Sequence, residues 1–203
     1  MKLYYARGAC SLSPHIALRE AGLDFDLDKV DLKNKLTADG GDFLAENPKG
    51  YVPALRLNSG DVLSEGVAIV LYIASLAPAA KLAPAAGTLD YYRLVEWLAF
   101  ISSELHKGFP PLFHPDSPEA VKTQAREKLS TRFAYVDRIL ADRTFLTGDT
   151  FSVADGYLFT VLRWVNHVGM TLADWPSLTR FFEQVSARPA VRAALIAEGL
   201  LKN

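Results

Sequence analysis

Over the first 80 residues the pattern of hydrophobic and polar positions changes its period repeatedly. Short apolar or alternating runs, typical of half-buried strands, occur four times, and helical runs lie between and after them. The predicted strands are 2–5, 25–30, 51–57 and 61–64, and the predicted helical segments are 13–22, a short or irregular 40–47, and 65–76. The turn Asn58-Ser59-Gly60 joins the last two strands as a hairpin. The predicted order is βαβ, then α, then ββα.

The first predicted helix has a signal at each end. Ser13 provides a capping hydroxyl, and Pro14 suits the first helical position because that residue needs no N–H partner. Gly22 is a natural C-terminal stop. We therefore expect a loop between the first strand and Ser13.

Beyond residue 80 the strand signals fade, and helical periodicity continues along the chain. The stretch 77–89, rich in alanine and proline, marks the change. We expect a first domain over 1–80, a linker over 81–88 and a helical domain over 89–203. The helices predicted in the last part are 90–107, 118–141, 152–168, 177–187 and 190–198.

Two of these helices carry an apolar stripe at helical spacing, which predicts one buried face each. The stripes are Leu94, Leu98, Ile101 and Leu105, before the stop signal Pro110-Pro111, and Val121, Leu129, Phe133, Val136 and Leu140. A third helix begins with the capping box Ser152-Val153-Ala154-Asp155. The pattern thus predicts a small α/β domain followed by an all-α domain.

Composition excludes several classes of protein. The chain has 203 residues, half of them hydrophobic, and its 22 basic and 23 acidic residues leave a net charge of -1. This composition differs from that of disordered and fibrous chains. The chain also lacks the excess of positive charge that would attract nucleic acid or an anionic membrane. The start of the chain lacks the apolar core of a secretion signal, and no uncharged run reaches the ~20 residues of a membrane span. We expect a soluble, cytoplasmic protein.

The single cysteine, Cys10, lies just before the first predicted helix. A thiolate there would be stabilised by unpaired backbone N–H groups and the helix dipole. Ser13 occupies the place of the second cysteine of a C-x-x-C pair, so no disulfide can form within the chain. A mixed disulfide with a small thiol stays open as one interpretation, and a buried, inert cysteine as the other.

Two further segments offer backbone groups to a ligand. Pro53 at the start of a strand allows a cis Val52–Pro53 bond that would leave the Val52 backbone free for a peptide-like ligand, although statistics favour trans. Gly66 opens an apolar helix whose N–H groups suit a carboxylate. Glu65 beside it suits an ammonium group, or simply complements the helix dipole.

On the long helix, Ser103, His106 and Lys107 are spaced i, i+3, i+4 and are predicted to share a polar face. This face suits an anion or a thiolate, although taken alone it is more typical of a solvated surface. Four aromatic residues are candidates for an apolar pocket or for core packing: Phe109, Phe113, Tyr157 and Trp164. The remaining histidines show no ligand spacing, so we expect no metal site, and no glycine-rich phosphate motif occurs.

Five segments together resemble the bacterial beta class of glutathione transferases over essentially the whole chain. They are Met1-Lys2-Leu3-Tyr4-Tyr5, Gly8-Ala9-Cys10-Ser11-Leu12-Ser13-Pro14-His15, Asn47-Pro48-Lys49-Gly50-Tyr51-Val52-Pro53-Ala54-Leu55, Glu65-Gly66-Val67-Ala68-Ile69 and Glu104-Leu105-His106-Lys107-Gly108. The resemblance implies a thioredoxin-like N-terminal domain, an all-α C-terminal domain, a homodimer and a role in detoxification.

The resemblance also implies roles for individual residues. Cys10 lies next to the sulfur of glutathione and can form a mixed disulfide with it, and His106 reaches the same sulfur with Lys107 beside it. The residues expected to hold glutathione are Lys35 at the glycine carboxylate, Val52 before a cis Pro53 at the cysteinyl part, and Glu65 and Gly66 at the γ-glutamyl end. Ser103 and Glu104 are expected to contact glutathione bound to the partner subunit. Ala99 departs from the asparagine of many members, so the cross-subunit hydrogen bond of that asparagine is not expected here, whereas the activity still is.

The function that follows is attack of the glutathione thiolate on a small hydrophobic electrophile, with glutathione as co-substrate and no metal. A glutathione-dependent thiol–disulfide reductase or dehalogenase is the alternative within the class. A non-catalytic interaction module of the same fold is the alternative outside it.

Overall fold

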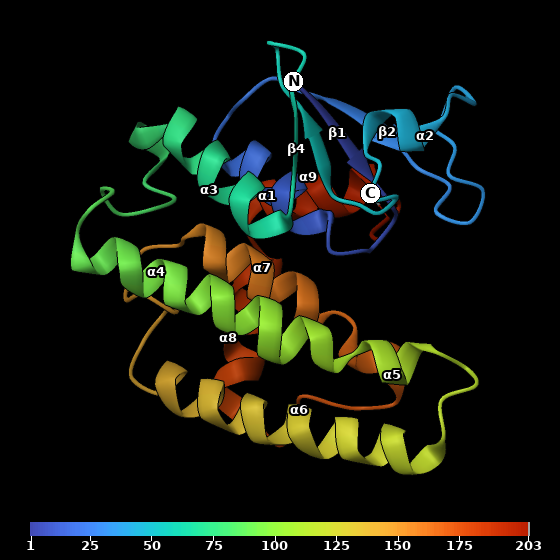
Figure 1. Ribbon diagram of the computed structural model, residues 1–203. Helices are drawn as coiled ribbons and strands as arrows, with labels where there is room; N and C mark the ends of the chain where they lie inside the picture. The colour runs from blue at the N-terminus through green and yellow to red at the C-terminus, as the bar shows by residue number, and fades with distance from the viewer. Residues whose placement is uncertain (203) are drawn as a thin grey trace. The chain divides into compact units, whose positions relative to one another are not determined.

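The computed structural model describes residues 1–202. The chain divides into two compact units, one formed by Met1–Ala83 with the C-terminal segment from Arg188 onward, and one by Pro84–Ala187. The first unit contains all four strands of the sheet, and the second is helical (Figure 1). The predicted thioredoxin-like α/β domain followed by a helical domain is therefore confirmed as the fold class.

The sheet of the first unit has four strands in the order β2-β1-β3-β4. They are β1 (Lys2–Tyr5), β2 (Asp26–Lys29), β3 (Ala54–Arg56) and β4 (Val62–Ser64). β1 pairs parallel to β2 and antiparallel to β3, and β3 pairs antiparallel to β4. Each predicted strand is present, although the last three are shorter than expected.

Successive residues of the strands face opposite sides of the sheet. Tyr4 and Ala54 are register partners, and they share a buried cluster with Phe43 of the short helix α2 (Phe43–Glu46). Leu3 and Leu55, also register partners, face the other side and are fully buried. The helices α1 (Leu12–Glu20) and α3 (Gly66–Leu76) pack against each other in this unit, and a short 3₁₀ turn, Pro78–Ala80, follows α3.

The predicted start of α1 is wrong by two residues. The N-cap is Ser11, so Ser13 and Pro14 lie within the first turn. Proline is tolerated there because N–H groups of the first turn have no partner within the helix. The Ser11 hydroxyl accepts from the Ala6 N–H at 3.1 Å and lies 3.2 Å from the Ala6 carbonyl, which closes the loop that carries Cys10.

The second unit is built from α-helices with short irregular turns between them. Its elements are α4 (Leu89–Phe100), the π-helical turn Ile101–Leu105, the 3₁₀ turn His106–Gly108, α5 (Pro110–Phe113), α6 (Glu119–Leu140), α7 (Val153–Leu162), the 3₁₀ turn Val165–Val168, and α8 (Pro176–Ser186). The predicted single helix over 90–107 is thus wrong in its last third. The His106 N–H bonds to the Ile101 carbonyl, five residues back, which is the π-helical pattern.

Three further expectations change in this unit. Pro110 begins a short helix instead of only ending the previous one, because proline fits a first helical position. The helix predicted over 152–168 ends at Leu162 and continues as the 3₁₀ turn. Val121 is 42% exposed, and Ala125, about one turn further along, takes its place in the buried stripe of α6.

The capping box at the start of α7 is present as predicted. The buried Asp155 carboxylate accepts from the Ser152 backbone N–H at 2.8 Å, from its hydroxyl at 2.7 Å, and from the Leu146 N–H at 2.9 Å. Burial raises the pKa of Asp155 to about 6, while these three hydrogen bonds act in the opposite direction.

The last helix, α9 (Pro189–Ala197), packs on α1 and therefore groups with the sheet, whereas the predicted division placed it in the helical domain. Its periodicity predicted the helix but could not name its packing partner. Within residues 1–202, no helix combines the length and the apolar character that crossing a membrane requires.

Candidate functional site

Cys10 lies in the loop between β1 and α1, immediately before the N-cap Ser11. Its side chain is partly exposed, which argues against a buried, inert cysteine. The thiol donates to the Val52 carbonyl oxygen, with an Sγ–O distance of 3.3 Å. The Ser13 N–H bonds to the Cys10 carbonyl, and the Ser13 hydroxyl is buried without a hydrogen-bond partner among the described residues. The thiol is therefore at the helix entrance, as predicted.

The segment before β3 supplies the partner of Cys10. The Val52–Pro53 peptide bond is cis, as the family resemblance implied. The side-chain amide of Asn47 donates to the Tyr51 carbonyl at 2.8 Å, and the Gly50 N–H bonds to the Asn47 carbonyl. These bonds fix the turn that presents Val52 to Cys10.

Glu65 and Gly66 stand at the entrance of α3, next to this segment. A Cβ built on Gly66 would lie 3.8 Å from Pro53 Cγ, so the first residue of the helix adjoins the cis proline. Glu65 is the N-cap and has a φ of 72°, a conformation that non-glycine residues rarely adopt. Residues in such conformations lower stability, and they are found most often at functional sites, where the conformation itself serves the function.

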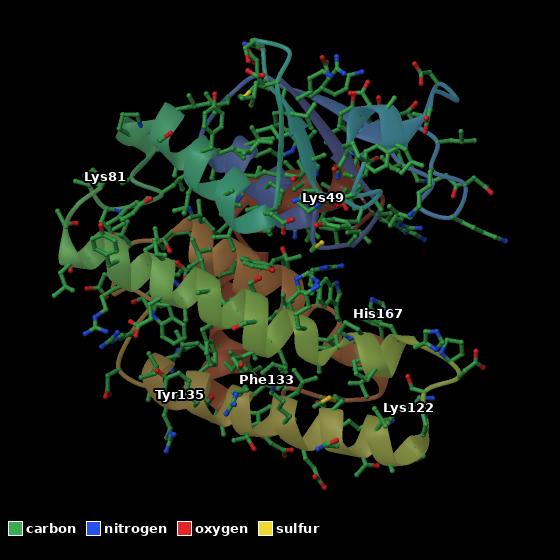
Figure 2. All side chains as sticks on the ribbon, in the orientation of Figure 1. Lys49, Lys81, Lys122, Phe133, Tyr135 and His167 are labelled. Atoms are coloured by element: carbon green, nitrogen blue, oxygen red, sulfur yellow. The ribbon has the colours of Figure 1, made fainter. Side chains whose placement is uncertain are left out.

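The Glu65 carboxylate has two partners that were not among the predicted site residues. Lys49 Nζ and Tyr51 Oη both lie 2.6 Å from Glu65 Oε1 (Lys49 is labelled in Figure 2). The hydrogen bond to Glu65 raises the pKa of Lys49 and that of Tyr51. Both residues stand inside the segment 47–55 on which the resemblance rested, so their place in the motif was the available signal.

Lys35 reaches the same region from the loop between β2 and α2. Its Nζ donates to the Gly50 carbonyl at 2.7 Å, and a Cβ built on Gly50 would lie 3.5 Å from Lys35 Cε. Lys35 has a φ of 59°, so it shares with Glu65 a left-handed or related backbone conformation. Five of the predicted residues, Lys35, Val52, Pro53, Glu65 and Gly66, therefore lie in or next to the segment before β3, whose Val52 carbonyl contacts Cys10.

In the second unit, His106 follows the π-helical turn and is mostly buried. Its Nδ1 lies 2.7 Å from the Tyr157 hydroxyl, and its ring meets the Trp164 ring edge-on at 4.9 Å between centroids. Burial lowers the pKa of His106 to about 4, and the neighbouring Lys107 acts in the same direction. At neutral pH the imidazole is therefore uncharged.

Three of the four predicted aromatic residues form one cluster, and the fourth, Tyr157, adjoins it through His106, whose ring meets both Tyr157 and Trp164. The ring centroids of Phe109, Phe113 and Trp164 lie 5.4–5.9 Å from one another. Phe109, Tyr157 and Trp164 are buried, whereas Phe113 is about half exposed. The cluster thus combines core packing with one accessible ring.

The polar face predicted for Ser103, His106 and Lys107 is only partly found. Ser103 is exposed and its hydroxyl donates to the Ala99 carbonyl of its own helix, while Lys107 is exposed and His106 packs among aromatic rings. The π-helical turn accounts for the difference, because it rotates His106 relative to an α-helix. Glu104 is held by Arg132 at 2.9 Å and by Lys128 at 3.4 Å, and the hydrogen bond from Arg132 lowers its pKa.

Known proteins are similar to both parts of the chain. Residues 1–75 match the glutathione S-transferase N-terminal domain, and residues 100–189 match the glutathione S-transferase C-terminal domain. The chain is 47% identical to glutathione S-transferase GstA of Escherichia coli O157:H7, over 98% of this chain and 100% of the relative.

Two solved structures are also similar to this chain over nearly its whole length. A sphingomonad glutathione S-transferase complexed with glutathione has 51% identity and a TM-score of 0.96, covering 99% of this chain and 100% of the other. The bacterial beta class glutathione S-transferase of Sphingomonas chungbukensis has 49% identity and a TM-score of 0.96, with the same coverage.

Proposed function

Since the chain belongs to the glutathione S-transferase family and to its bacterial beta class, we propose that it binds glutathione and promotes attack of the glutathione thiolate on small apolar electrophiles. The observation that carries the proposal is the 3.3 Å contact between the Cys10 thiol and the Val52 carbonyl, beside the charged groups of the same segment. Glutathione has a thiol that would lie beside Cys10 and Val52, and charged ends that would pair with the charged groups.

The first unit would hold the peptide. Glutathione carries two carboxylates, one ammonium and one thiol. Lys35 is the proposed counter-charge of the glycine carboxylate, and the Val52 backbone pairs with the cysteinyl part. Glu65 receives the ammonium, with Lys49 and Tyr51 already fixing its carboxylate. The Gly66 N–H, at the N-terminus of an 11-residue helix, receives the γ-glutamyl carboxylate.

Cys10 would act as the covalent partner of glutathione. Its thiolate attacks one sulfur of glutathione disulfide, the S–S bond breaks, and one glutathione leaves as the thiolate while the mixed disulfide forms. With a single cysteine in the chain, a second glutathione has to release Cys10 by the reverse exchange. This step would also serve a glutathione-dependent reductase, the alternative within the class.

The second unit would supply the groups for the electrophile. Neutral His106 can stabilise the thiolate only by donating a hydrogen bond, with Lys107 adding positive charge nearby. Phe113, the accessible ring of the aromatic cluster, is the proposed contact of an apolar co-substrate, backed by Phe109, Tyr157 and Trp164. Detoxification in the cytoplasm is the role that such chemistry fits.

A homodimer completes the proposal. The helix α4 exposes Leu89 and Tyr92, and Trp97 and Phe100 form a further aromatic group with Tyr135 of α6 (Tyr135 is labelled in Figure 2). Apolar side chains gathered on one face of a soluble protein are typical of a subunit interface. Ser103 and Glu104 would contact glutathione bound to the partner subunit.

The test is the mass of the intact protein after incubation with glutathione disulfide, together with conjugation of glutathione to an aryl halide. We expect a reversible gain of one glutathionyl group that is absent in Cys10→Ala, and conjugation that largely persists in this variant. Absence of conjugation in the wild type would refute the transferase. Absence of the adduct alone would remove the covalent role of Cys10.

A further inference from the structure

The carboxylate of Glu65 forms an exposed ion pair with Lys49 (Lys49 is labelled in Figure 2). Lys49 Nζ and Tyr51 Oη both lie 2.6 Å from the same oxygen, Glu65 Oε1. The side chains of Lys49 and Glu65 keep 46% and 57% of their surface exposed. Exposed ion pairs are weak because water screens both charges, so a ligand with suitable charges can open this pair at little cost.

The backbone of Lys49 is held independently of this ion pair. The Lys49 N–H donates to Asn47 Oδ1 at 3.3 Å, and the side-chain amide of the buried Asn47 donates to the Tyr51 carbonyl at 2.8 Å. Lys49 Nζ also lies 5.9 Å from the centre of the Tyr51 ring, a distance at which an aromatic face attracts a cation. The ammonium group can therefore leave Glu65 while the turn keeps its hydrogen bonds and the ring keeps the cation nearby.

The start of α3 offers backbone donors to a carboxylate, but no side-chain donor. Its first residues are Gly66, Val67 and Ala68, whose side chains carry no hydrogen-bonding group. The N–H groups of a helix N-terminus suit an anion, yet they supply no full positive charge. Glu65 immediately precedes Gly66, so a cation bound to Glu65 stands beside these N–H groups and can supply that charge.

An α-amino acid end carries an ammonium and a carboxylate on one carbon atom. When the ammonium binds Glu65, the carboxylate must lie beside it, close to the place that Lys49 Nζ occupies. An exchange of partners then leaves no charge unpaired, because the ligand ammonium pairs with Glu65 and the ligand carboxylate pairs with Lys49. A ligand with the ammonium alone would separate Lys49 from Glu65 and give Lys49 no new partner.

We propose that Lys49 binds the α-carboxylate of the γ-glutamyl end of glutathione, and that the Lys49–Glu65 ion pair opens to select ligands with a complete α-amino acid end. The inference rests on the proposed function and adds a specificity-determining residue to it. Tyr51 keeps its hydrogen bond to Glu65 during the exchange, and so holds the carboxylate in place for the incoming ammonium.

Two ligands and a matched pair of variants test the exchange. S-methyl glutathione cannot form a mixed disulfide with Cys10, and its 4-aminobutyryl analogue lacks only the carboxylate in question. Lys49→Met removes the positive charge and keeps most of the aliphatic chain. Lys29→Met makes the same change at an exposed position of the edge strand β2. Isothermal titration calorimetry gives the dissociation constant of each ligand for wild type and variants.

We expect Lys49→Met to weaken binding of S-methyl glutathione about threefold, the scale of one exposed ion pair. Binding of the 4-aminobutyryl analogue should stay unchanged or become tighter, because Lys49 then no longer competes with the ligand for Glu65. Lys49→Arg should keep most of the affinity for S-methyl glutathione, since the positive charge is retained. Lys29→Met should bind both ligands as the wild type does.

Three results would overturn the inference. Unchanged or tighter binding of S-methyl glutathione by Lys49→Met would mean that Lys49 only covers Glu65. An equal loss for both ligands would mean that Lys49 acts on the turn and not on the carboxylate, and an equal loss in Lys29→Met would mean that only net charge matters. A wild type that does not bind S-methyl glutathione would instead refute the proposed function, and the role of Lys49 with it.

Discussion

The imidazole of His106 is uncharged at neutral pH because it is packed between Tyr157 and Trp164. A charged form would lose its hydration without gaining a carboxylate, since the neighbouring Lys107 is itself positive. The residue can therefore donate or accept a hydrogen bond but does not act as a cation. Its protonation should instead appear as a pH dependence of stability.

The pKa of His106 is about 4 in the folded protein, below the ordinary histidine value of 6.5, so the unfolded chain binds the proton first as the pH falls. The wild type should lose about 2 kcal/mol of unfolding free energy relative to His106→Asn between pH 7 and pH 4.5. Urea unfolding at the two pH values measures this, with His114→Asn, an exposed histidine, as control. If the unfolding free energies of wild type and His106→Asn changed equally between the two pH values, the imidazole would not be desolvated in the folded protein.

The hydroxyl of Tyr157 orients the His106 ring through its 2.7 Å contact with Nδ1. Tyr157→Phe keeps the ring in the aromatic cluster but removes this partner. We expect a loss of about 1 kcal/mol in stability and a severalfold lower kcat for conjugation, with KM for glutathione nearly unchanged. Tyr135→Phe, on the partly exposed face of α6, is the matched control. Equal kinetics in both variants would remove the orienting role.

At the scale of the element, the turn after α4 shows that sequence periodicity can predict burial and still miss the type of helix. Leu94, Leu98, Ile101 and Leu105 are all buried and keep helical spacing, so the pattern predicted one helix. The π-helical bond between His106 and Ile101 leaves the apolar pattern intact while it rotates the polar residues that follow. A hydrophobic period reports which residues are buried, but not a one-residue change in hydrogen bonding.

Gly108, at the end of this turn, allows close contact with α6. A Cβ at this position would lie 2.7 Å from Leu129 Cδ2 and 3.1 Å from its Cγ, and Leu129 is fully buried. Gly108→Ala should therefore cost about 1–3 kcal/mol of unfolding free energy, and displacement of the turn should lower conjugation activity. The double variant Gly108→Ala/Leu129→Ala should show a favourable coupling energy in a thermodynamic cycle. Additive losses would mean that the two positions do not compete for space.

At the scale of the whole molecule, the sequence predicted the motifs better than their connections. The local pattern placed Cys10, Val52 and Glu65 at element boundaries but left their roles open, and the family resemblance selected them. Lys49 and Tyr51 were missed because an exposed lysine and tyrosine carry no local pattern that distinguishes a partner of Glu65 from a solvated side chain. The contact between His15 and Glu198, 183 residues apart, has no local signal at all.

The proposed homodimer can be tested through the exposed apolar residues of α4. Leu89 is 70% exposed and Tyr92 is 60% exposed, and a partner subunit that covered them would remove this apolar surface from water. Tyr92→Glu should shift the molecular mass measured by sedimentation toward the monomer, because it would bury an unpaired charge. Leu44→Glu, on the exposed side of α2, should leave the mass unchanged. A wild type that sediments as a monomer at all concentrations would refute the dimer.

The packing of α9 on α1 also has a consequence for biosynthesis. The Gly8 N–H, in the loop that carries Cys10, donates to Glu198 Oε2 at 2.9 Å. Gly8 and Glu198 are 190 residues apart, so the loop obtains this hydrogen bond only after Glu198 has left the ribosome. A nascent chain can form the sheet early, since domains begin to fold from the N-terminus during translation. The loop that carries Cys10 would nevertheless lack this hydrogen bond until Glu198 has been synthesised, and translation products truncated before residue 198 would never form it.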